Sequence, residues 1–90
     1  MHINIEQEGG QCPVQIEGTV NGIPFYFRAR GTSWSLSVAK EETSCPLDKT
    51  AWMHKETYGK GPFDAGWMEL EEARGFLHKA LNIWAENRPV

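Results

Sequence analysis

Two short turns, one strand apart, constrain this chain more than any other feature of its sequence. Asn21-Gly22 lies between segments in which apolar and polar residues alternate, and Asn-Gly favours a type I′ hairpin turn. A two-residue turn there pairs 14–20 with 23–30, so that the apolar residues of both strands share one face. A slip of one residue would move Phe25 and Phe27 to the other face, and the alternation therefore specifies the register.

The second turn extends the same face. Gly31-Thr32 suits a type II′ turn, which favours glycine at its first central position, and predicts a third strand at 34–39. Residues 2–7 also alternate and predict a strand, either beside 14–20 or at the far edge of the sheet. Residues 52–58 alternate loosely and are compatible with an edge strand. The prediction is an antiparallel sheet of three to five strands with a meander at its centre.

Near the C-terminus the apolar period changes from two to 3.6, which predicts an amphipathic helix over about 69–87. Its apolar stripe consists of Leu70, Ala73, Leu77, Ala80, Leu81 and Trp84. We interpret Gly75 as a point of close packing against the sheet. The helix lies across the apolar face of the meander, and the predicted fold is a single α+β domain over 1–90.

Charge and cysteine content narrow the class of protein. The chain of 90 residues has a formal net charge of −3, and no uncharged stretch approaches the length of a membrane span. Nothing at the N-terminus has the pattern of a secretion signal. Two cysteines, Cys12 and Cys45, favour free thiols in a reducing compartment. We therefore expect a small acidic cytoplasmic protein that does not bind membranes.

The reactive side chains form no recognisable catalytic or metal-binding motif. His2, His54 and His78 are widely separated, and none has a second histidine or a cysteine at ligand spacing. We predict no enzymatic activity, no metal and no cofactor. A catalytic interpretation requires Cys45, His54 and a carboxylate to converge in one pocket.

The polar face of the predicted sheet is the first candidate binding surface. It carries Tyr26, Arg28 and Arg30 on one strand, Glu17 beside Tyr26, and serines on the next strand. Such a face is either solvated or faces a partner. Aromatic and arginine side chains on an open sheet are also typical of single-stranded nucleic-acid binding, which remains the alternative function.

Two further groups are candidate partner contacts. Trp52 and Trp67 stand beside methionines in the irregular middle of the chain, and these residue types are enriched at protein interfaces. They either contact a partner or close the end of the core. A second group crowds the first turn of the predicted helix, where it either compensates the helix dipole or meets a basic nucleic-acid channel: Glu69, Glu71 and Glu72.

Two stretches carry a resemblance to a known group of proteins. They are the segment 23–31 followed by Trp34-Ser35-Leu36, and the run 63–68 before Glu71-Glu72-Ala73-Arg74. Both resemble short proteins encoded by phages and mobile elements, several of which are anti-CRISPR inhibitors. The resemblance implies a compact α+β protein, monomeric or homodimeric, that binds a host protein or nucleoprotein complex. It implies a non-catalytic inhibitor that occludes a surface of a nucleoprotein effector.

Overall fold

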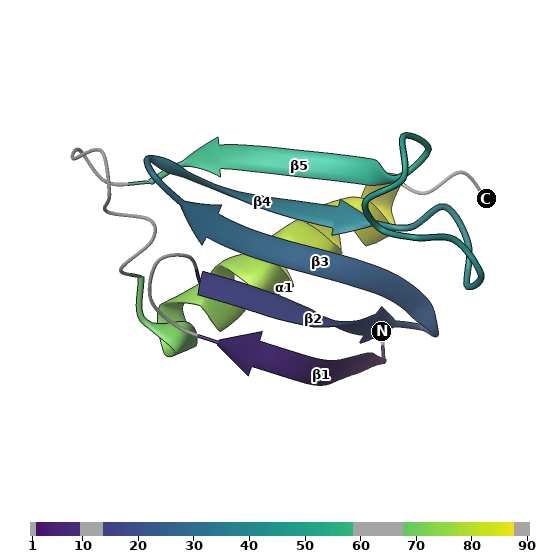
Figure 1. The fold of residues 1–90 in the computed structure, drawn as a ribbon, viewed down its shortest axis with the longest axis horizontal. Coiled ribbons are helices and arrows are strands. Elements are labelled where there is room, and N and C mark those ends of the chain that lie inside the picture. The colour runs from purple at the N-terminus through teal and green to yellow at the C-terminus, as the bar shows by residue number, and fades with distance from the viewer. Residues whose placement is uncertain (1, 10–13, 59–67, 88–90) are drawn as a thin grey trace.

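The computed structural model describes residues 2–9, 14–58 and 68–87. Five strands and one helix follow in the order β1 (Ile3–Gly9), β2 (Val14–Val20), β3 (Ile23–Arg30), β4 (Ser33–Val38), β5 (Trp52–Thr57) and α1 (Leu70–Asn87). The strands form one antiparallel sheet in sequence order, and α1 crosses one of its faces diagonally (Figure 1). The predicted α+β fold is confirmed.

The two glycine turns have the expected geometry. Asn21 and Gly22 adopt φ angles of 52° and 81°, the left-handed pair that a type I′ turn requires. Gly31 adopts a φ of 65° at the second turn, which suits the first central position of a type II′ turn. Phe27 pairs with Ile16 on one side and Leu36 on the other, so the register is the predicted one. Strand β4 begins and ends one residue earlier than predicted.

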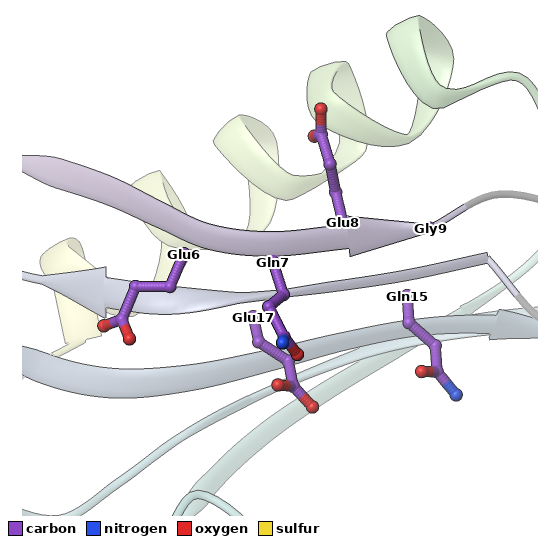
Figure 2. A pocket seen from close by; sticks show the side chains of 6 residues that line it. All are labelled: Glu6, Gln7, Glu8, Gly9, Gln15 and Glu17. Carbon is purple, nitrogen blue, oxygen red and sulfur yellow. The ribbon is translucent and has the colours of Figure 1, made fainter.

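The first strand settles a question that the sequence left open. β1 lies beside β2, with Ile3 opposite Val20, and it continues two residues beyond the predicted end. Its register shifts between Ile5 and Gln7, which leaves Glu6 as the extra residue of a β-bulge. Figure 2 shows the consequence: Glu6 and Gln7 point away from the helix, whereas Glu8 points toward it.

The core lies between the sheet and α1, and Trp34 is its largest fully buried side chain. Trp34 stacks on Phe27 of the sheet at 5.6 Å between ring centroids and on Phe76 of the helix at 5.2 Å. Aromatic pairs at such distances add about 0.5–1.5 kcal/mol beyond the burial of their area. The helix contributes its predicted stripe, of which the buried members are Ala73, Leu77, Ala80, Leu81 and Trp84.

Two interpretations are wrong. Ser37 was expected on a solvated face but is 3% exposed, because the segment between β4 and β5 folds back over that end of the sheet. There Cys45 and Leu47 line the same hollow as Tyr26. Gly75, interpreted as a close-packing point, is exposed, and a Cβ atom added there would meet nothing within 4 Å.

The segment between β4 and β5 contains successive turns. The amide of Asp48 donates to the carbonyl of Cys45 at 3.0 Å, and the amide of Ala51 donates to the carbonyl of Asp48 at 3.0 Å. The side chain of Asp48 also accepts hydrogen bonds from the amide and hydroxyl of Thr50. Aspartate in this role favours turns over a helix interior.

Replacement of Gly18 by alanine tests the close approach of β1 to β2. A Cβ atom at Gly18 would collide with the backbone carbonyl oxygen of Asn4, and backbone cannot move aside as a flexible side chain does. We expect Gly18→Ala to lower the free energy of unfolding by about 1–3 kcal/mol, measured by urea denaturation. The control, Gly75→Ala, should raise it by about 0.5–1 kcal/mol, since that helix position is open. Equal stability of Gly18→Ala and the wild type would contradict the placement of β1.

Candidate partner-binding surface

The sheet face turned away from α1 carries the predicted arginines, and we call it the open face. On this face Arg28 lies between Gln15 of β2 and Ser35 of β4, and Lys55 of β5 follows next to Ser35. Tyr26 lies in the neighbouring row between Glu17 and Ser37. The sheet therefore brings together cations from two strands, β3 and β5, that are far apart in sequence.

The cations of the open face have no acidic partner in the described part of the chain. Arg30 and Lys55 are exposed and Arg28 is half-buried, and none of the three forms an ion pair with a described residue. The Nε atom of Arg28 is buried and has no hydrogen-bond partner among those residues. A buried donor without a partner is costly, so a shift of the Arg28 side chain that brings Nε to an acceptor would be favourable.

The other half of the open face is acidic. Glu6 and Gln7 of the bulged strand and Gln15 and Glu17 of β2 point to the same side and line a hollow of about 450 Å³ (Figure 2). The predicted neighbour relation of Glu17 and Tyr26 is confirmed by the register. The open face thus has an acidic side over β1 and β2 and a basic side over β3 to β5.

Two exposed apolar side chains lie at the open face. Leu47 is 71% exposed and lines a hollow with Tyr26 of the basic side and with Glu6 and Glu17 of the acidic side. Met53 is 63% exposed on β5, opposite Ser37. Exposed methionine beside tyrosine and arginine matches the residue preferences of protein interfaces. Leu47 was not a candidate from the sequence. A leucine among turn residues that belongs to no strand or helix pattern does, however, indicate an exposed apolar side chain. Lys55 was not a candidate either, because the sequence does not specify which neighbour residues 52–58 pair with.

The tryptophan candidates do not belong to the open face. Trp52 is half-buried on the helix-facing side of β5, opposite Val38, and stacks on His54 at 6.0 Å. Trp67 lies outside the described residues. Met68, grouped with Trp67 in the sequence, is 3% exposed and belongs to the core. The alternative that these side chains close the end of the core therefore holds for Met68.

The three glutamates at the start of α1 are exposed and lie on the helix side of the molecule. Glu72 accepts a hydrogen bond from the hydroxyl of Tyr58. Arg74 pairs with Glu8, and this pairing, with a smaller contribution from the charge of Glu71, raises the pKa of Arg74. Glu72 thus ties the helix start to the end of β5. Glu69 and Glu71 lie where the helix dipole favours negative charge.

His54, named above with Cys45 in the catalytic interpretation, contacts the carboxylate of Glu56. The His54 Nε2 atom lies 2.7 Å from Glu56 Oε2, and Lys79 Nζ lies 2.9 Å from Glu56 Oε1. The hydrogen bonds from His54 and then Lys79 lower the pKa of Glu56 below its usual 4.5. Cys45 lines a hollow on the open face, whereas His54 faces the helix, so the two do not meet.

Comparison with known proteins assigns no function to this chain, so the open face is the feature that bears on its function. No protein-family model matches the chain, and no curated protein or solved structure resembles it significantly. Within the described ranges, no three histidine, cysteine or acidic side chains are grouped as metal ligands would be. No helix in the same ranges has the length and apolar character needed to cross a bilayer.

Acid should weaken the attachment of α1 to the two edge strands. Hydrogen bonding to Arg74 lowers the pKa of Glu8, as His54 and Lys79 lower that of Glu56. A carboxyl whose folded pKa is depressed stabilises the fold above its unfolded pKa, and this contribution is lost as pH falls through the folded pKa. We expect the urea midpoint of the wild type to decrease as the pH is lowered from about 5.5 to about 3, and that of Glu56→Gln to decrease less. Glu6→Gln, at an exposed residue outside these pairs, is the control, and its urea midpoint should depend on pH as that of the wild type does. If the urea midpoint of Glu56→Gln also depends on pH as in the wild type, the expectation is wrong.

Proposed function

We propose that this protein is a non-catalytic binding module that docks on another protein through the basic side of its open face. In its specific form, the proposal is a phage-encoded inhibitor of the anti-CRISPR type that occludes a surface of a host nucleoprotein effector. The observation that carries it is a pair of arginines on the central strand of a rigid sheet, with no ion-pair partner among the described residues and with exposed apolar side chains nearby.

Placement on the central strand favours binding. β3 is paired on both sides, so the backbone that carries Tyr26, Arg28 and Arg30 is held in place before any partner arrives. A preorganised surface loses less conformational entropy on binding than a mobile loop does. The side chains pointing the other way belong to the core, which leaves the outward ones available for contact.

The dimensions of the sheet define how much of the molecule a partner must cover. Five strands span about 19 Å and seven residues extend about 23 Å, which gives a flat outline of about 440 Å². A standard protein interface buries about 800 Å² on each partner. The contact therefore has to extend beyond the strands, and the segment between β4 and β5, which carries exposed Leu47, is the adjoining surface.

The inhibitor form of the proposal rests on the resemblance of two sequence segments to phage-encoded proteins. A protein of this size with principal extents of 38 × 22 × 21 Å suits the blocking of a site on a larger complex. The acidic helix start lies on the helix side rather than on the open face. Docking therefore depends on Tyr26, Arg28 and Arg30 in this proposal.

Charge reversal of the two arginines tests the proposal. Purified CRISPR effector complexes, each loaded with guide RNA, are assayed for target binding and cleavage with and without the protein. We expect the wild type to inhibit one of them, and Arg28→Glu/Arg30→Glu to lose inhibition by at least about tenfold, because two contacting cations become anions. Circular dichroism and the urea midpoint establish that the variant is folded.

The matched control is Arg74→Glu/Lys79→Glu, which changes the net charge by the same amount at two exposed cations of α1, on the opposite side of the sheet from the open face. It should inhibit as the wild type does. If the wild type inhibits no effector and captures no host complex, the proposal is wrong. If both double variants lose inhibition equally, net charge rather than the open face is responsible.

The alternative function, single-stranded nucleic-acid binding, is favoured by the same unpaired arginines beside Tyr26. A salt series with single-stranded RNA and DNA separates the two functions. Contact of three cations with phosphates predicts a log–log slope of about −2 for the binding constant against salt. We expect no measurable binding at physiological salt, because Glu17 adjoins Tyr26 and the net charge is −3. Tight binding with that slope would favour the alternative.

A further inference from the structure

The outward side chains of β4 form a strip of small hydroxyl groups between two rows of long side chains. We call Ser33, Ser35 and Ser37 the serine strip. Arg28 and Arg30 lie along it on the β3 side, and Lys55 and Met53 lie along it on the β5 side. Ser33 and Ser35 are half-buried, and Ser37 is buried at the end where the segment after β4 folds over the sheet.

The spacing of the cations matches that of alternate residues in an extended chain. Arg28 and Arg30 are two residues apart on one strand, which separates them by about 6.8 Å, and Arg28 and Lys55 are two strand spacings apart, about 9.6 Å. Carboxylates at alternate positions of an extended peptide are also about 6.8 Å apart. One carboxylate above Ser35 would lie between Arg28 and Lys55, and the next would lie above Ser33 beside Arg30.

The donors along the strip suit carboxylate oxygens. Arginine and lysine form charge-assisted hydrogen bonds with carboxylates, and serine hydroxyls donate to the same oxygens. The buried Nε atom of Arg28 has no partner in the described ranges, and a shift of this side chain toward a bound carboxylate would supply one. Met53, which lies opposite the buried Ser37 on β5 and is 63% exposed, offers apolar contact at that end of the strip.

The limited extent of the positive charge favours a peptide over a nucleic acid. The basic side consists of three cations and ends at Glu17, which adjoins Tyr26 and belongs to the acidic hollow with Glu6. A nucleic-acid strand carries a charge at every nucleotide, and single-strand sites commonly span about 4–16 nucleotides. Such a strand would extend beyond these cations onto the acidic side, whereas a short peptide with two or three carboxylates would not.

We propose that the partner docks through an extended acidic segment that lies along the serine strip, with its carboxylates held by Arg28, Arg30 and Lys55 and an apolar residue at the Met53 end. This inference rests on the proposed protein-binding function and specifies the chemistry of the partner. It adds Lys55, which was not a candidate from the sequence, and it gives the serines of the candidate face a specific role in the contact.

The test uses the full chain and a fluorescein-labelled synthetic peptide in which glutamates alternate with serines and a leucine stands at one end. Fluorescence anisotropy measures binding to the wild type and to four single variants, three at the cations of the strip and one control. We expect Arg28→Gln to bind about tenfold more weakly, because its contact is partly desolvated, and Lys55→Gln about two- to fivefold more weakly at its exposed position. Lys79→Gln, at an exposed position of α1 on the opposite side of the sheet, is the control and should bind as the wild type does.

A second peptide, in which glutamine replaces each glutamate, should not bind. Lys55 and Arg30 are exposed, so Lys55→Gln and Arg30→Gln keep the test decisive if Arg28→Gln fails to fold. Equal affinity of the wild type and all folded variants for the acidic peptide would overturn the inference.

The remaining outcomes identify other occupants. If the acidic peptide does not bind but the wild type inhibits an effector and Arg28→Glu/Arg30→Glu does not, this inference fails while the proposed function stands. If a single-stranded DNA oligonucleotide displaces the peptide and binds more tightly, the occupant is a nucleic acid and the inference is wrong. If sedimentation shows a wild-type dimer that the double variant abolishes, a second copy occupies the open face and the inference is wrong.

Discussion

The burial of Trp34 between the sheet and α1 is the contact on which the rest of the structure depends. Its ring packs on Phe27 of the neighbouring strand and on Phe76 of the helix, and it is 1% exposed. Side chains alternate along a strand, so burying Trp34 also determines that Ser33 and Ser35 point the other way. The same alternation across the β3–β4 pairing turns Arg28 and Arg30 outward. The open face is therefore a consequence of how the core is packed.

Much of this architecture was predictable because its causes are local. Asn21-Gly22 and Gly31-Thr32 determine two registers, and the change of period to 3.6 locates α1. The bulge at Glu6 was not predictable, because it arises where β1 approaches Gly18, which lies far along the chain. The path of the segment after β4 was not predictable either, because its residues show no apolar periodicity. The burial of Ser37 and the exposure of Leu47 follow from that path.

The candidate site was predictable to the extent that it lies on one strand. Tyr26, Arg28 and Arg30 share the outward side of β3, which alternation alone indicates. Lys55 and Met53 join them only through the pairing of β5 with β4, and a weakly alternating segment does not specify that register. Trp52 and the glutamates of the helix start belong to the other side of the sheet. Composition identified them as candidates, but residue type carries no information on which side of a sheet a side chain lies.

The two sides of the sheet use charge in different ways. On the helix side, Glu8 pairs with Arg74 and Glu56 with Lys79, so each edge strand is tied to α1 by an ion pair. Solvent screens exposed pairs of this kind, so they orient the helix more than they stabilise it. On the open face, Arg28, Arg30 and Lys55 have no ion pair with a described residue and contribute nothing comparable to the fold. Their removal should leave the core intact, because every contact of Trp34 lies on the opposite side of the sheet. Cations that the fold does not need, held on its central strand and an edge strand, are therefore the part of this molecule best explained by a partner.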